Sequence, residues 1–190
     1  AGNNNITVGT FSLNGTTATA TMGTGTWTLT GTSTIWDLGS GNSVNPGTST
    51  IKITDNSTSA KLFIGVGKTY ANIWVGNTGT GGLSISGANT FNSFRIDAGA
   101  SVKLPASSTT TVAAVQIDGT ALPITLGSTA PGTAAMLTKT GVGATYLDRC
   151  TIRDTSASPG ATFFARSSTN VGNNSNITFV PGNSNLLSFF

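Results

Sequence analysis

The sequence of 190 residues contains no histidine and no glutamate, and its single cysteine is Cys150. Without histidine the chain cannot build a Ser-His-Asp or Cys-His catalytic arrangement or a histidine zinc site. All six acidic residues are aspartates, so a carboxylate pair for glycoside hydrolysis must come from aspartate alone. One cysteine cannot form a disulfide within the chain. These absences predict that the protein is not an enzyme and that it holds no metal ion and no cofactor.

Charge is also scarce. Charged residues make up 8% of the chain, and nine Lys and Arg against six acids give a formal net charge of +3. The basic residues are scattered from Lys52 to Arg166 without a run, whereas nucleic-acid binding needs a concentrated basic footprint. No apolar run approaches the roughly 20 residues that a membrane helix needs. We therefore expect no nucleic-acid partner and no membrane insertion.

The chain is instead rich in small polar residues. Thr (35), Gly (25), Ser (21) and Asn (17) make up more than half of it. Hydrophobic residues still account for 37% and recur at short intervals, which is not typical of a disordered chain. Threonine and the β-branched aliphatic residues fit a pleated, half-buried surface. This composition predicts a folded all-β protein.

Short apolar clusters recur every 8 to 14 residues, and most alternate one apolar, one variable and one apolar residue. This alternation is typical of a strand with one buried face. Turn-forming residues such as Asp97-Ala98-Gly99 and Asp118-Gly119 separate the clusters. The predicted strands are centred on residues 51–53, 62–64, 73–75, 83–85, 94–96, 102–104, 115–117, 124–126 and 150–152.

A repeat decides between the possible all-β folds. The segments TYANIWV (69–75), TFNSFRI (90–96) and TVAAVQI (111–117) share one pattern and lie 21 residues apart, twice over. A second predicted strand follows each segment. A fixed period near 20 indicates stacked coils. A fourth copy, residues 147–152, fits 35 residues further on, as if one coil carried an insertion, and it would place Cys150 in the column of Ile73, Phe94 and Val115.

We therefore predict a right-handed parallel β-helix, a solenoid with coils of about 21 residues, in which equivalent apolar residues stack in internal ladders. The alternative is a β-sandwich or jelly roll, which also has short, evenly spaced strands. The expected organisation is an N-terminal β segment and cap (1–48), the solenoid (49–180) and an apolar C-terminal tail (181–190) in one continuous domain. We expect the tail to cap the last coil or to contact a neighbouring subunit through Leu186, Leu187, Phe189 and Phe190.

Residues between the paired core positions of the repeat must point outward. They are Trp74, Arg95 and Gln116, and Thr151 would join them in the fourth copy. On neighbouring coils, Trp74 and Arg95 would be close enough for a cation–π contact. An exposed Trp on a rigid sheet suits a subunit interface or a glycan-binding platform. The alternative is a partly covered surface aromatic residue without a ligand.

Two other patterns resemble functional motifs. Asp97 and Asp118 each follow the last core residue of a repeat, so they would lie one coil apart. Their Asp-Ala-Gly and Asp-Gly contexts favour turns in which Asp bonds its own backbone over a shared cation or a catalytic pair. The segment Gly65–Thr69 resembles the end of a phosphate-binding loop, but Leu62 stands where that motif has its first glycine. We expect a turn there.

The Thr-, Ser-, Asn- and Gly-rich strands, the T-[YF]-x-x-[IF]-x-[VI] coils and the closing segment 154–179 resemble β-helical surface proteins of bacteriophages and bacteria, including tail-fibre-like and tailspike-like chains. The resemblance implies a structural component of a virion or an extracellular appendage, such as a fibre, spike or decoration-type subunit. Such a protein would be found on the virion or at the cell surface. It would assemble with copies of itself, with a trimer favoured, and with other virion or appendage proteins.

Two other functions are consistent with the sequence. One is a carbohydrate-binding adhesin that recognises a surface glycan. The less favoured one is an ice-binding solenoid, suggested by the threonine alternation in residues 17–21 and 24–34. Tailspike-like chains often cleave polysaccharides, but the absence of glutamate argues against such an activity here.

Overall fold

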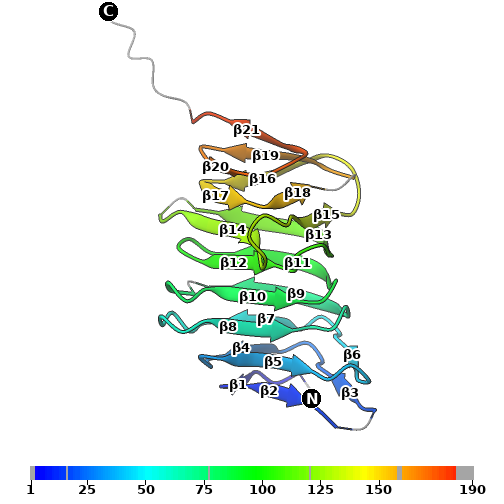
Figure 1. The fold of residues 1–190 in the computed structure, drawn as a ribbon. Coiled ribbons are helices and arrows are strands. Elements are labelled where there is room, and N and C mark those ends of the chain that lie inside the picture. Colours follow the sequence, from blue (N-terminus) through cyan, green and yellow to red (C-terminus); the bar gives the residue numbers. More distant parts are fainter. Residues whose placement is uncertain (1–2, 16, 77, 120, 158–159, 183–190) are drawn as a thin grey trace, which may run out of the picture.

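The computed structural model describes residues 3–15, 17–76, 78–119, 121–157 and 160–182, which form a stack of β-coils from the N-terminal to the C-terminal end (Figure 1). These residues contain no helix, and every strand pair among them is parallel. The stack has about seven turns with a spacing of about 22 residues. The predicted β-solenoid is confirmed, and the sandwich alternative, which needs antiparallel pairs, is excluded.

Two long sheets run along the stack. The first follows the order β1 (Ile6–Val8), β4 (Thr26–Leu29), β7 (Thr50–Ile53), β9 (Thr69–Val75), β11 (Thr90–Ile96), β13 (Thr109–Asp118), β16 (Ala144–Asp148), β19 (Thr162–Arg166) and β21 (Ile177–Val180). The second follows the order β2 (Phe11–Leu13), β5 (Thr34–Leu38), β8 (Lys61–Ile64), β10 (Leu83–Ser86), β12 (Ser101–Leu104), β14 (Ile124–Ser128), β17 (Cys150–Arg153) and β20 (Thr169–Gly172).

Four shorter strands of the described part of the chain lie off these two paths. In the first two coils β3 (Thr19–Thr21) pairs with β6 (Ser43–Asn45). Further on, β15 (Ala135–Lys139) pairs with the first half of β13 and with β18 (Thr155–Ala157). The N-terminal strands β4 and β5 pair in parallel with β7 and β8 of the next coil.

The 21-residue repeat has the predicted register. Phe94 pairs with Ile73 on one side and with Val115 on the other. The neighbouring ladders, Tyr70/Phe91/Val112 and Val75/Ile96/Ile117, align in the same way. Stacking equivalent residues buries apolar surface that one coil cannot bury alone, which explains why the apolar pattern repeats.

Aromatic rings form a continuous column inside the first five coils. Phe11 stacks on Trp36 with ring centroids 4.2 Å apart, and further ring contacts continue through Phe63 and Tyr70 to Phe91. The polar atoms of this column are paired. Trp36 Nε1 donates to Tyr70 Oη at 3.2 Å, and Tyr70 Oη donates to the Gly65 carbonyl at 3.1 Å. Burial raises the pKa of the Tyr70 hydroxyl, so the ring is neutral in the core.

The expected insertion is present, but it changes the place of Cys150. The extra strand β15 lies between β14 and β16, and Leu147 then rejoins the ladder of Ile117. Cys150 pairs with Ile124 in the second sheet. The prediction that Cys150 follows Val115 in the first sheet is therefore wrong, because the chain turns directly after Asp148, and Arg149 adopts a positive φ of 54° there. Cys150 is buried, as expected.

Asparagine side chains join the turns of neighbouring coils, which explains part of the unusual composition. Asn89 Oδ1 accepts from the backbone N–H of Gly67 at 3.0 Å, and Asn89 Nδ2 donates to the Ser86 carbonyl at 2.9 Å. Asn174 makes both of its bonds to the preceding coil, where its Oδ1 accepts from Thr155 N–H and its Nδ2 donates to the Ile152 carbonyl. The Gly65–Thr69 segment is a turn into β9, as predicted, and Asn89 secures it.

Candidate functional site

The predicted contact between Trp74 and Arg95 is present on the outer face of the first sheet. The Arg95 guanidinium carbon lies 4.0 Å from the centre of the Trp74 ring. On the preceding coil, Lys52 places its ammonium nitrogen 3.7 Å from the same ring. Lys52 and Arg95 pair with Trp74 from opposite sides, so each face of the indole contacts a cation. A sugar ring that stacked on this indole would have to displace one of them.

The carboxylate of Asp97 completes this cluster, and the prediction that Asp97 bonds the backbone of its own turn is wrong. Asp97 accepts from Trp74 Nε1 at 2.6 Å and from Arg95 Nε at 2.7 Å. Its side chain therefore bonds the outer ladder instead of its own turn backbone. The side chain of Asp118 lies outside the described residues, so the shared-cation alternative stays untested. The cluster of Lys52, Trp74, Arg95 and Asp97 has the contacts of a surface brace between three coils.

The other two predicted platform residues lie in different places. Gln116 is exposed and pairs with Arg95, so it continues the outer ladder of the first sheet. Thr151 pairs with Thr125 and Thr169 in the second sheet, and its expected place beside Gln116 is wrong for the same reason as that of Cys150.

The outer ladder ends in an aromatic pair that the sequence pattern did not reveal. Tyr146 precedes the Ile117–Leu147 pair by one residue, so it follows Gln116 in the column. Tyr146 is 44% exposed and stacks on Phe164 with centroids 5.8 Å apart. The guanidinium carbon of Arg166 lies 4.1 Å from the centre of the Tyr146 ring. The interrupted repeat hid this alignment.

The end of the stack at β1 and β2 exposes apolar side chains. In the second coil the inward residues Leu29 and Leu38 are fully buried. The equivalent residues of the first coil, Val8 and Leu13, are only partly buried, although they contact the same core. At the other end the inward residues of β21 are also partly buried. Both ends of the described solenoid therefore present apolar cross-sections bounded by unpaired strand edges.

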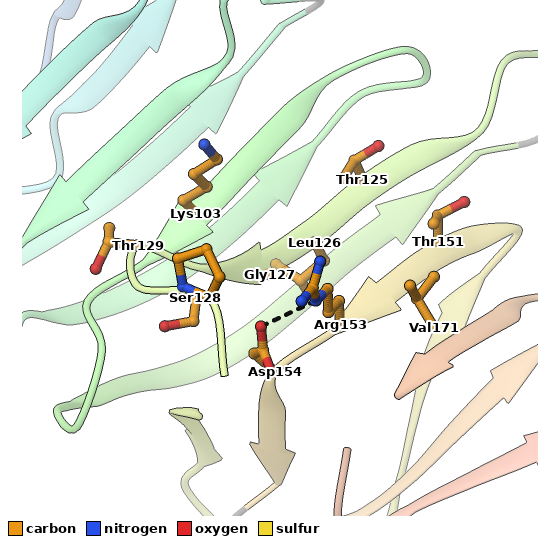
Figure 2. Close-up of a pocket in the computed structure, with 11 residues that line it drawn as sticks. Lys103, Thr125, Leu126, Gly127, Ser128, Thr129, Thr151, Arg153, Asp154 and Val171 are labelled. Atoms are coloured by element: carbon orange, nitrogen blue, oxygen red, sulfur yellow. Dashed lines mark ion pairs between the residues drawn. The ribbon is translucent and has the colours of Figure 1, made fainter. Parts of the chain in front are cut away.

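A groove of about 350 Å³ lies on the outer face of the second sheet, over β12, β14 and β17 (Figure 2). Gly127 forms its floor, because it occupies an outward position without a side chain. Lys103 pairs in register with Gly127, and Arg153 lies on the other side of that glycine. Hydroxyls of Thr125 and Thr151 line one flank, and the other lining residues are Leu126, Ser128, Thr129, Pro131, Asp154 and Val171.

Buried Asp154 holds Arg153 and the nearby loop in place. Its carboxylate lies 3.2 Å from Arg153 Nε, and it accepts from Gly132 N–H at 3.0 Å and from Asn173 Nδ2 at 2.7 Å. The hydrogen bond from Asn173 is the largest of the effects that lower the pKa of the Asp154 carboxyl. The Arg153 side chain is 57% exposed, and its Nε is the atom that contacts Asp154 at 3.2 Å. The Arg153 side chain lines the groove next to Asp154 (Figure 2).

A second hollow of about 300 Å³ adjoins the groove and shares Thr151 with it. The exposed side chain of Arg149 lines this hollow. The outward column presents a hydroxyl on each coil at Ser101, Thr125, Thr151 and Thr169, and the three threonines line the two depressions. This face therefore combines hydroxyls with three cations, Lys103, Arg149 and Arg153.

The outward threonines of β4 are not continued as a flat array on β7 and β9. The pair Thr26 and Thr28 on β4 is followed in register by Thr50 and Lys52, and then by Asn72 and Trp74. A two-column threonine face is thus lost after one coil, which leaves the ice-binding alternative without a surface on this sheet. The predicted subunit-contact residues Leu186, Leu187, Phe189 and Phe190 lie outside the described residues.

Comparison with protein-family models, with curated proteins and with solved structures gives no match to this chain.

Proposed function

We propose that the protein is a structural component of a virion or an extracellular appendage that assembles with copies of itself. The observation that supports this role is the pair of apolar, strand-bounded ends of the solenoid. Unpaired strand edges are templates for pairing with another chain. Parallel coils can extend one another across such an end, and the contact between a β21 end and a β1 end is heterologous, so it repeats along an axis.

The free edge of β1 offers a precise test. The Val8 carbonyl accepts from Thr30 N–H at 2.9 Å, so Val8 faces β4. Backbone groups of successive strand residues alternate in direction, which turns the N–H of Thr7 toward the open end. Thr7→Pro removes that donor and leaves the bonds to β4 intact. Thr7→Val keeps the donor and is the matched control.

The experiment is light scattering over a range of protein concentrations, with electron microscopy of the same samples. We expect the wild type and Thr7→Val to form a concentration-dependent series of end-to-end species that Thr7→Pro shortens. If the protein instead has a single trimer mass that Thr7→Pro does not change, end-to-end contact is wrong. The side-by-side trimer that the family resemblance implies would then be the mode of assembly. A chain that stays monomeric at every concentration and joins no particle would overturn the structural role.

A further inference from the structure

We propose that the groove over β12, β14 and β17 binds an acidic polysaccharide, with a carboxylate or sulfate group of one sugar held between Lys103 and Arg153. This inference goes beyond the structural role and does not depend on it. It gives a place and a chemistry to the glycan recognition that the sequence leaves as an alternative function.

The charge of the groove selects an anion. Lys103 and Arg153 lie two coils apart, about 9.6 Å at the usual strand spacing, with side-chain-free Gly127 between them. Among the described residues, Lys103 has no acidic partner within ion-pair distance, and Asp154 is engaged with Arg153, Gly132 and Asn173. Two positive charges therefore face one hollow in which no described carboxylate is unpartnered.

The arginine is positioned in advance of binding. Buried Asp154 holds Nε of Arg153, and the side chain, which ends in a planar fork of nitrogens, is more than half exposed. Such a fork matches the two oxygens of a carboxylate or sulfate group. Because the protein has already fixed this side chain, a ligand loses less side-chain entropy when it binds.

The rest of the surface fits a sugar better than a nucleic acid. Hydroxyls of Thr125 and Thr151 offer donors and acceptors on successive coils, and Pro131 and Val171 supply apolar contact. None of the described residues that line the groove is aromatic, so they offer nucleobases no ring on which to stack. The adjoining hollow with Arg149 continues the basic face, which suits a polymer that carries an acidic group at intervals.

The test is isothermal titration calorimetry with an oligogalacturonate, an oligomer of dextran sulfate and a neutral dextran of similar length. We expect the wild type to bind one or both acidic oligomers, with affinity that falls as salt is added, and to ignore the neutral one. The acidic oligomer that binds more tightly identifies the group as carboxylate or sulfate. Equal binding of neutral dextran, or of a short DNA duplex titrated in the same way, would overturn the proposal.

Three variants locate the site. Lys103→Gln and Arg153→Gln should each weaken binding about tenfold or more, because each removes a charged hydrogen-bond donor. Gly127→Ser should weaken it through steric filling of the floor, without a change of charge. Lys68→Gln removes one positive charge from the distant turn before β9 and should leave binding unchanged. If Lys68→Gln weakens binding as much as Lys103→Gln, the interaction is non-specific and the site is wrong.

Lys103 is exposed and makes no ion pair with a described residue, so its variant should fold normally.

Discussion

The ammonium nitrogen of Lys61 lies 2.8 Å from Asp55 Oδ1. Lys61 occupies an inward-facing position of β8, and Leu83 occupies the equivalent position in the next coil. The Lys61 side chain is fully buried. Its ammonium also donates to the carbonyls of Ser57, Ser59 and Thr78 at 2.9–3.2 Å. One inward lysine thus ties together the loops that follow β7 and β9.

Removal of this lysine should destabilise the fold strongly. Lys61→Met removes the ammonium from the Asp55 carboxylate and from three carbonyls, and breaking one side of a buried ion pair costs about 3–5 kcal/mol. Asp55→Asn should cost less, because the amide still accepts from Ser57 and Lys61 keeps its carbonyl partners. Urea unfolding monitored by circular dichroism measures both free energies. A Lys61→Met variant as stable as the wild type would show that the loops close without the ammonium.

The same pair predicts how stability depends on pH. The hydrogen bond from Lys61 is the main cause that lowers the pKa of the Asp55 carboxyl, and Ser57 adds to it. An unfolded aspartate titrates near pH 4, so the stabilisation is complete above about pH 4 and is lost as pH falls through the lower folded pKa.

This pH dependence is tested with a series of urea unfolding curves between pH 7 and pH 2. The free energy of unfolding of Asp55→Asn should fall less over the acidic part of this range than that of the wild type. Asp154→Asn should also reduce the acid loss, because the pKa of the Asp154 carboxyl is lowered in the folded state. Parallel curves for the wild type and both variants would contradict the assignment.

The cation contacts of the Trp74 ring should contribute more to the free energy of unfolding than the hydrogen bond of its N–H. Trp74→Leu removes both cation–π contacts, each worth about 0.5–1 kcal/mol at a partly exposed site, together with the bond to Asp97. Trp74→Phe keeps an aromatic face for Lys52 and Arg95 and loses only the N–H. We expect the free energy of unfolding to decrease in the order wild type, Trp74→Phe, Trp74→Leu. Equal losses for the two variants would show that the cation contacts contribute nothing.

The internal column should be the most sensitive part of the repeat. Phe94→Ala opens a cavity beside Phe91, whose ring centre is 5.8 Å away, and large-to-small changes of this kind cost about 3–5 kcal/mol. Asn92→Ala, at an exposed position of the same strand, should change stability by less than about 0.5 kcal/mol. Differential scanning calorimetry compares the two. Similar melting temperatures for both variants would mean that the interior is loosely packed.

Features that repeat along the sequence could be predicted, and features that depend on one coil could not. The ladder through Ile73, Phe94 and Val115 follows from apolar periodicity, because every coil must bury the same face. Lys61 is a charged residue at an inward position, where the apolar alternation has a hydrophobic residue. The sequence pattern therefore could not predict that Lys61 is buried. The groove needs Gly127 beside Lys103 together with a loop held by Asp154, and these residues come from three coils of unequal length.

A comparison of two glycines distinguishes the cost of backbone strain from the cost of steric contact between coils. Gly87 has a φ of +91°, and a Cβ there would lie 2.6 Å from the backbone nitrogen of Gly67 on the preceding coil. Gly132 has a φ of +81°, but a Cβ there would meet no atom within 4 Å. Gly132→Ala should therefore lose only the conformational term of about 1–2 kcal/mol. Gly87→Ala should lose clearly more, since backbone on a neighbouring coil must also move. Thermal unfolding of both variants tests this order, and a larger loss for Gly132→Ala would show that the coils are not in close contact at this turn.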